Sequence, residues 1–479
     1  MGQSYKKNIV YNSIYRFVVI VTPLITSPYI SRVLGAENIG VYTYCNAYAM
    51  YFVICAMMGV SDYGNRKIAQ VRDCEERLNH DFSQIMYLQL FLGGISTLVY
   101  LITILFFNTY FIIRLVLVLY VMTAAVDINW FAFGIEEFKF TSIRSIICRI
   151  FIVVGIFTFV HSEADLPIYV SIIIIGNTMS IIPVWFLVRK KIQLQAPCIK
   201  EIFQHLKPNL VLFLPVVATT LYQQMDKLML GVAELETEVG YYQNAENIVT
   251  LPTFITSAIV TVMLPFTSNM IAKGKSKENI GLLKKTIEYS SAINIAMMFG
   301  LMAIADIFIP WYLGPGYERS AELIIILAPI IVLGGLSSVI RYQLLIPDER
   351  DKIFTFSIIC GAIINIIINF LLIPCYQAVG AAIATVVSYS VVLIIQMVAI
   401  VKDISIVHII KMIVPYIMIG GIMYIGIKLL NSIVLIAPYI VVGIDIVVGC
   451  IFYGTFTLIW MHITKDSVLD SLKRKKRNI

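Results

Sequence analysis

Long apolar runs alternate with short polar stretches along the whole chain. Each run has about 20 residues or more, enough for one helix to cross a hydrocarbon core of ~30 Å. Because lipid offers no partners to backbone amides, such a run spans a membrane as a helix, which pairs its backbone groups internally. We predict about fourteen spans, with the long run 84–134 divided at Asn108-Thr109. They cover residues 8–33, 39–60, 84–108, 110–134, 141–160, 167–188, 209–231, 239–264, 287–312, 322–346, 353–374, 378–401, 409–430 and 434–462.

A short pattern occurs twice, once at spans 1 and 2 and again at spans 7 and 8. The stretch 33–48, "VLGAENIGVYTYCNAY", matches 229–247, "MLGVAELETEVGYYQNAEN". Each ends a span with Leu-Gly, crosses a short acidic loop and enters the next span with Gly-x-Tyr. Gly40 corresponds to Gly240, an offset of 200 residues. Since six is an even number of spans, both repeats enter the membrane in the same direction, as in transporters whose halves share an axis along the membrane normal.

Composition and charge agree with a multi-pass membrane protein. Of 479 residues, 59% are hydrophobic and 14% charged, against about a quarter charged in soluble domains. With a cytoplasmic N-terminus, 28 of the 36 Lys and Arg residues fall on inside segments, 4 fall outside, and 4 lie within spans. This asymmetry predicts that both termini are cytoplasmic. The same inside bias explains the net charge of +7, so no nucleic-acid partner is required.

Cysteine and histidine predict neither a disulfide framework nor a metal site. The eight cysteines form no CxxC pair and most lie inside spans, and the five histidines are scattered. No catalytic motif or ATP-binding domain is found, which argues against an enzyme. The energy then comes from a gradient, of protons or sodium ions for example, from the membrane potential, or from downstream consumption of the product. No cofactor is predicted.

Polar residues inside the spans mark the candidate site. On span 8 they recur every three to four residues, which places them on one helix face: Gln243, Glu246, Asn247, Thr250, Thr253, Ser257 and Thr261. Span 7 adds Thr219, Thr220, Gln223, Asp226 and Lys227, and span 1 adds Asn8, Asn12, Arg16, Pro23 and Ser27. A polar face is costly against lipid, so it should line a wet cavity or meet another helix.

We assign candidate roles from charge and depth. The predicted substrate-binding residues are Arg16, Asn12, Lys227, Arg341, Gln223 and Asn247, and the predicted ion-coupling residues are Asp226, Glu246 and Asp127. Structural alternatives stay open. Asp226 and Lys227 are ~100° apart on a helix, so at least one needs a partner elsewhere. Arg341 lies near the inner end of its span, where it can snorkel. Asp445, near the middle of span 14, is either buried against a partner or titrates.

Several stretches resemble the polysaccharide-export family of the multidrug/oligosaccharidyl-lipid/polysaccharide superfamily, the bacterial oligosaccharide-lipid flippases, including those of O-antigen. They are "PYISRVLGAENIGVYTY" (28–44), "YGNRKIAQVRD" (63–73), "GIEEFKFTSIRSI" (134–146), "QMDKLMLG" (224–231) and "IPCYQAVGAAIATVVSYS" (373–390). The resemblance implies an all-α polytopic membrane protein with two six-helix bundles, related by a pseudo-two-fold axis around a central cavity, plus two extra C-terminal helices. The corresponding domains are 1–190, 191–402, 403–464 and a basic cytoplasmic tail, 465–479.

The resemblance also implies a function. A flippase of this family moves an undecaprenyl-diphosphate-linked sugar unit from the inner to the outer leaflet of the bacterial cytoplasmic membrane. Predicted partners are that lipid-linked glycan, membrane lipid, and a polysaccharide polymerase with a chain-length regulator. The family's cavities are predominantly cationic, whereas the deep charges here are mixed.

Two other functions are weighed against the flippase. A cation-coupled multidrug exporter of the same superfamily would favour an acidic cavity, which Arg16 on the span 1 face disfavours. A membrane enzyme such as a sugar polymerase or ligase would need a sizeable outside loop, and the outside loops have only about seven residues.

Overall fold

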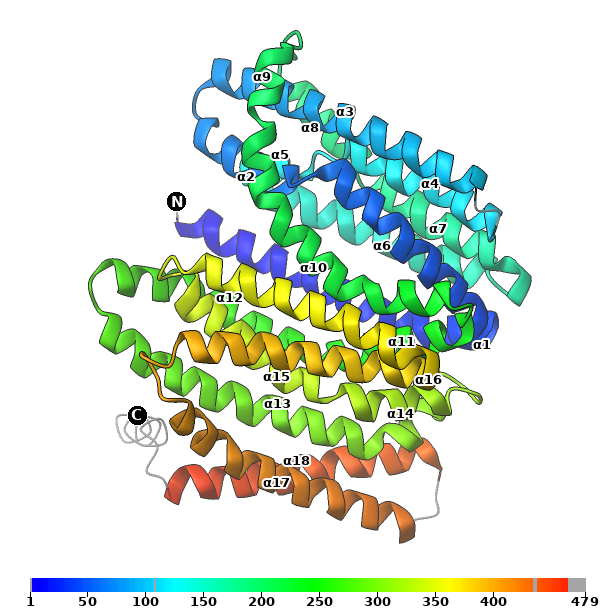
Figure 1. The fold of residues 1–479 in the computed structure, drawn as a ribbon, viewed down its shortest axis with the longest axis vertical. Helices are drawn as coiled ribbons and strands as arrows, with labels where there is room; N and C mark the ends of the chain where they lie inside the picture. The colour runs from blue at the N-terminus through cyan, green and yellow to red at the C-terminus, as the bar shows by residue number, and fades with distance from the viewer. Residues whose placement is uncertain (1, 107–108, 434–436, 464–479) are drawn as a thin grey trace. The chain divides into compact units, whose positions relative to one another are not determined.

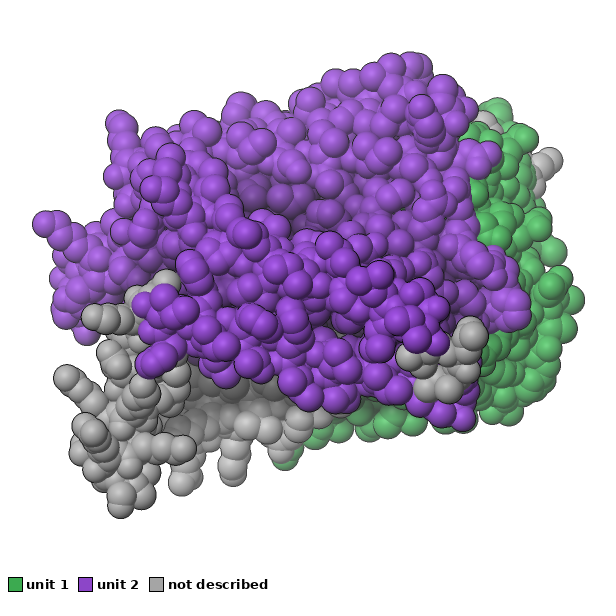
Figure 2. Space-filling model, turned by 90° about the horizontal axis from the view of Figure 1, so that it is seen from below, with its two compact units in different colours: residues 1–243 green, residues 244–479 purple. Residues whose placement is uncertain are grey.

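A computed structural model of the chain describes residues 2–106, 109–433 and 437–463, with the side chains of residues 2–17, 20 and 138 left out of that description. Every regular element in this part of the chain is a helix (Figure 1). The chain forms two compact units, residues 1–243 and 244–479 (Figure 2), and the division falls within one helix. The division concerns compactness alone, and the bundle boundaries given above stay predictions.

Unit 1 contains eleven labelled α-helices, the last shared with unit 2, and one short 3-10 helix. They are α1 (Gly2–Met57), α2 (Val60–Val71), α3 (Glu75–Phe106), α4 (Phe111–Val126), α5 (Asn129–Gly134), α6 (Phe138–Phe159), η1 (Glu163–Asp165), α7 (Leu166–Met179), α8 (Ile182–Lys191), α9 (Ile199–Gln204), α10 (Leu206–Val232) and α11 (Glu236–Thr250). One apolar cluster joins α1, α3, α4, α6 and α7. A second joins α2, α3, α5 and α8 around Trp130 and Phe82, whose ring centroids are 5.3 Å apart.

Unit 2 contains seven further α-helices and one π-helical segment. They are α12 (Thr253–Ala272), α13 (Ser276–Tyr312), α14 (Glu318–Leu327), α15 (Pro329–Ile340), η2 (Arg341–Leu345), α16 (Asp351–Ala399), α17 (Ile406–Ile433) and α18 (Pro438–Ile463). Outside these helices, Arg350 bonds Asp403 at 2.7 Å and Asp348 at 2.6 Å. The hydrogen bond with Asp403 raises the pKa of Arg350 and ties two neighbouring connections together.

The two C-terminal helices are part of unit 2. In Figure 1, α17 and α18 run along α13, and polar contacts reinforce this packing. The Tyr416 hydroxyl of α17 donates to Glu288 at 3.0 Å, and the Tyr453 hydroxyl of α18 donates to the Ala292 carbonyl at 2.8 Å. A Cβ on Gly420 would overlap the Phe299 ring, so α17 approaches α13 closely at this glycine.

The predicted number of spans agrees with the described part of the chain. Twelve helices there are long and apolar enough to cross a membrane. Two of these contain a break, at Gly35 in α1 (φ 74°) and at Gln377 in α16 (φ 51°). Counting both sides of each break gives fourteen segments. The predicted division of the run 84–134 also holds, since α3 ends at Phe106 and α4 begins at Phe111, although Asn108 itself lies outside the described residues.

Span 8 differs from its prediction as one continuous helix. α11 ends at Thr250 and α12 begins at Thr253, with a turn at Leu251-Pro252 between them. Proline has no amide hydrogen and its ring clashes with the preceding turn, which favours such a break. The polar positions of span 8 are therefore divided between two helices.

The connection from α8 to α9 is fixed to α3 although it forms no helix. Amides of residues 193, 195 and 198 donate at 3.0–3.1 Å to buried side chains of α3, namely Asn79, Ser83 and Gln84. The Gln84 amide nitrogen also donates to the Ala196 carbonyl at 3.2 Å. The polar residues at the start of α3 therefore hold this connection in place through hydrogen bonds.

Candidate functional site

The two repeats meet inside unit 1. A Cβ on Gly40 of α1 would overlap the carbonyl of Glu236, and a Cβ on Gly240 of α11 would overlap the carbonyl of Ala36. Glu236 is offset from Ala36 by 200 residues, as Gly240 is from Gly40. Contacts that are reciprocal in this way arise when two equivalent segments pack across a two-fold axis. These two segments are therefore related by a local two-fold axis between α1 and α11, where glycine permits close backbone approach.

Three predicted site residues lie together on α10. Asp226 is 2% exposed and Lys227 5% exposed. The Tyr242 hydroxyl of α11 donates to the Asp226 carboxylate at 2.7 Å, and the Lys227 ammonium donates to the Gln223 carbonyl at 3.1 Å. Asp226 thus has its partner on the neighbouring helix, across the loop that joins α10 to α11.

Asp127 occupies the end of α4, where the backbone becomes extended. Its carboxylate accepts the Asn129 amide at 2.9 Å. The Gln89 side chain of α3 donates to the carbonyls of Ala124 and Asp127, both at 2.8 Å, and accepts the Trp130 indole at 2.9 Å. This buried glutamine supplies partners to helix-end carbonyls that a break would leave unpaired.

Arg16 and Asn12 both lie in α1, and their side chains belong to the part that the structure does not describe. Their contact with substrate therefore stays a prediction.

The remaining predicted residues, Glu246, Asn247 and Arg341, belong to unit 2. The Thr250 hydroxyl donates to the carbonyls of Glu246 and Asn247 at 2.9 and 3.1 Å. Further along the same face, Ser257 and Thr261 also bond carbonyls four residues earlier. Backbone carbonyls of the same helices accept the hydrogen bonds of these hydroxyls. The hydroxyls on this polar face therefore do not require a water-filled cavity.

Arg341 begins the π-helical segment η2. Its guanidinium lies 3.6 Å from the ring centroid of Phe354 and 4.8 Å from that of Tyr342. Cation–π contacts of this kind stabilise a partly buried arginine. Among the described residues, its Nε has no hydrogen-bond partner.

One buried cation was not among the predicted site residues. Arg114 of α4 is 4% exposed and lies against the rings of Tyr44 and Tyr48 at 5.8 and 5.3 Å. Nearby, the Tyr110 hydroxyl donates to Glu236 at 2.7 Å. From the sequence, Arg114 was counted among the four cations of the outside segments, and the tyrosine-rich start of span 2 was the available signal for an aromatic partner.

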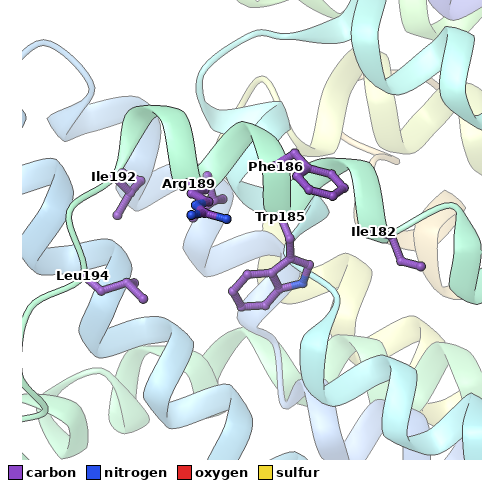
Figure 3. Close-up of a pocket in the computed structure, with 7 residues that line it drawn as sticks. Ile182, Trp185, Phe186, Arg189, Ile192 and Leu194 are labelled. Atoms are coloured by element: carbon purple, nitrogen blue, oxygen red, sulfur yellow. The ribbon is translucent and has the colours of Figure 1, made fainter.

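A cavity of about 540 Å³ lies beside α8. Its lining is apolar except for one cation: Ile182, Trp185, Phe186, Val188, Arg189, Ile192 and Leu194. Figure 3 shows Arg189 between Trp185 and Ile192 along this segment. Because none of the predicted substrate-binding residues lines it, this cavity adds no support to the predicted substrate site.

The sequence matches the family described as "Polysaccharide biosynthesis protein" over residues 5–271, more than half of the chain. The chain belongs to this family. The match includes both repeats and the α10 cluster of Gln223, Asp226 and Lys227. It confirms the resemblance identified from the sequence.

Individual relatives agree. The "Putative O-antigen transporter" of Escherichia coli (strain K12) is 25% identical over 389 residues, which cover 79% of this chain and 92% of the relative. The "Probable low-salt glycan biosynthesis flippase Agl15" of Haloferax volcanii is 24% identical over 254 residues, which cover 52% of each protein. These relatives are named as transporters and flippases.

Solved structures show the fold. "Lipid II flippase MurJ, inward closed conformation" matches with a TM-score of 0.75 at 16% identity, covering 95% of this chain and 99% of that one. An inward-facing multidrug-resistance MATE family transporter of the MOP superfamily matches with a TM-score of 0.63 at 14% identity, covering 85% and 98%. The protein is a helical multi-pass membrane protein with the fold of this superfamily, which confirms the predicted fold class.

Proposed function

We propose that the protein is a flippase for undecaprenyl-diphosphate-linked oligosaccharide repeat units. It moves them from the inner to the outer leaflet of the bacterial cytoplasmic membrane by alternating access, for synthesis of O-antigen, capsule or exopolysaccharide. The observation that carries this proposal is membership of the polysaccharide biosynthesis family over residues 5–271. The relative named as an O-antigen transporter, matched over 92% of its length, supports it.

The chemistry of such a substrate suits the chain. A diphosphate with several sugars cannot cross hydrocarbon unaided, so it needs a polar path and cations for its phosphate oxygens. Buried or half-buried cations occur in both units, at Lys227 and Arg341, and Arg16 is a third candidate in α1.

A cation-coupled multidrug exporter is the second candidate, favoured by the match to the MATE transporter. That match leaves 15% of this chain uncovered, whereas the flippase structure leaves 5%. An exporter of organic cations also gains nothing from buried Lys and Arg. Drug-resistance measurements in a strain expressing this protein address this alternative directly, since an exporter raises resistance and the flippase leaves it unchanged.

The location, orientation and partners form part of the proposal. Both termini are cytoplasmic, the protein acts as a transporter without catalysis of its own, and a polymerase with a chain-length regulator receives the flipped unit. The basic bias of the inside segments supports this orientation.

The substrate site is tested at Arg16. In a strain with a glycan-export defect, Arg16→Ala should abolish complementation, and Arg16→Lys should restore part of it, because lysine keeps the charge but lacks the planar fork that bonds phosphate bidentately. Arg32→Ala, which removes an exposed arginine of the same helix, is the matched control. Membrane abundance is checked by immunoblot, and normal export by Arg16→Ala at normal abundance refutes the role.

Coupling is tested at Asp226 and Glu246. We propose that either binds a proton or sodium ion and biases the two access states through differential affinity. Asp226→Asn and Glu246→Gln should then flatten the dependence of transport on pH or sodium. Tyr242→Phe is the control for Asp226, because it removes the hydrogen bond while keeping the carboxylate. If transport by both acid variants keeps the native dependence on pH and sodium, neither acid couples transport to an ion.

A further inference from the structure

A second acidic site lies in the two C-terminal helices, apart from the predicted ion-coupling residues. Asp445 is the only acidic residue of α18, and it follows Pro438 by seven residues, about 10 Å along the helix. It is 1% exposed. Since the rest of α18 is strongly apolar, a carboxylate here is expensive to keep charged.

The neighbour of Asp445 is Asn431 of α17. The Asn431 amide nitrogen, Nδ2, donates to Asp445 Oδ2 at 2.9 Å. Two oxygen atoms of this pair are buried without a hydrogen-bond partner among the described residues, Asp445 Oδ1 and Asn431 Oδ1. Both are acceptors, so neither can satisfy the other while Asp445 is ionised.

One cation among the described residues lies near Asp445, and it is shared with another acid. The helices that pack against α18 are α13 and α17. The nearby charge on α17 is Lys428, whose ammonium already pairs with Asp306 of α13 at 2.5 Å and lies 5.9 Å from the Tyr424 ring centroid. On α18 itself, the Tyr453 hydroxyl donates to the Ala292 carbonyl.

We propose that Asp445 and Asn431 form a proton-binding site. One proton taken from water forms an O–H bond at Asp445 Oδ1, and this hydroxyl donates to Asn431 Oδ1. The Asn431 amide continues to donate to Asp445 Oδ2, so the acid and the amide are joined by two hydrogen bonds in a ring. A single proton removes the buried charge and gives both unpartnered oxygens a partner.

A proton fits this site better than a metal cation. Sodium prefers roughly six oxygen ligands, like other hard cations, whereas the pair offers three, the two carboxylate oxygens and one amide oxygen. The site is separate from Asp226, Glu246 and Asp127, and the argument does not depend on which substrate the protein carries. Loss of the proton leaves an anion between α17 and α18 and weakens their packing.

Infrared spectroscopy of the purified full-length protein in lipid nanodiscs tests the proposal. At neutral pH, the carbonyl stretch of a protonated carboxylic acid should be present in the native protein and absent from Asp445→Asn. Asn431→Leu should shift this band to higher frequency, because the acid loses its hydrogen bonds. Glu278→Gln, which removes an exposed acid of the same unit that pairs with Lys275, should leave it unchanged. A native spectrum that equals that of Asp445→Asn at every pH shows that Asp445 is ionised and overturns the proposal.

Thermal unfolding gives a second readout. The native Tm should fall as pH rises above about 4, because the folded protein keeps a proton that the unfolded chain has released. Asp445→Asn, whose amide keeps a donor at this position, should lose that part of the dependence. If sodium chloride but not potassium chloride raises the native Tm, and Asp445→Asn abolishes the effect, the site binds sodium and the proton assignment is wrong. Equal pH dependence in both proteins also contradicts it.

Discussion

Because the two repeats approach each other closely, we predict that a glycine-to-alanine change at their contact destabilises the protein, the opposite of the usual effect in a helix. Alanine in place of helical glycine usually stabilises by about 1 kcal/mol, because glycine loses more backbone entropy on folding. At Gly240 the added methyl group would overlap the Ala36 carbonyl. Overpacking costs about 1–3 kcal/mol, and a backbone carbonyl cannot rotate away, so the upper end applies. Gly240→Ala should therefore destabilise unit 1 by about 2 kcal/mol.

The assay is thermal unfolding of the purified protein in detergent. For domains of about 150–250 residues, 1 kcal/mol shifts Tm by about 2–4 °C, so we expect a decrease of about 4–8 °C. Gly40→Ala should behave alike, since its methyl group would overlap the Glu236 carbonyl. In the double variant the decrease in Tm should be smaller than the sum of the two single decreases, because the first methyl group already separates the helices.

Gly94→Ala on α3 is the control. Nothing lies within 4 Å of a Cβ at Gly94, so this change should raise Tm slightly. If Gly240→Ala is as stable as Gly94→Ala, or if the two repeat variants add fully, the reciprocal contact is not as described and the axis argued from it loses its support.

Three further predictions concern single contacts and topology. Tyr242→Phe should cost about 1.5–3 kcal/mol by removing the hydrogen bond from the tyrosine hydroxyl to the Asp226 carboxylate, and Asp226→Asn should cost less in that background than alone, as a double-mutant cycle of Tm values would measure. Gln89→Leu should cost more than Tyr242→Phe, because it removes three hydrogen bonds at once, two of them fully buried, and normal thermal stability would contradict the network around it. In intact cells, a cysteine at exposed Ser162 should react with an impermeant thiol reagent and one at exposed Ser276 should not, and the reverse pattern would invert the proposed topology.

The spans, their number and the repeat could be predicted because each depends on local sequence. Span length follows from apolar runs, and the match of Gly40 with Gly240 identified two equivalent segments before their contact was known. The break in span 8 carried a local signal, Pro252, which the regular spacing of polar residues outweighed in the prediction. A proline near the middle of a span can either kink a helix or end it, and packing decides which.

The partners of buried polar residues could not be predicted in the same way. Asp226 faces Tyr242 because a tight loop folds α11 back onto α10, and the sequence gives that loop's length without its direction. Gln89 bonds the end of α4, 35 residues away, and nothing in its own neighbourhood indicates this. Arg114 was counted among the cations of the outside segments, whereas tyrosines of α1 pack against its guanidinium.

The way in which the connection between α8 and α9 is held affects its hydrogen exchange and its sensitivity to proteases. A segment without helix normally exchanges its amide hydrogens within the dead time of an experiment and is readily cut by proteases. Here the amides of Gln193, Gln195 and Cys198 are held by buried side chains of α3. These amide hydrogens should therefore exchange only as fast as the start of α3 opens. The segment is fixed to α3 and does not behave as a flexible linker. Any movement of α9 away from α3 has to break these three side-chain hydrogen bonds first.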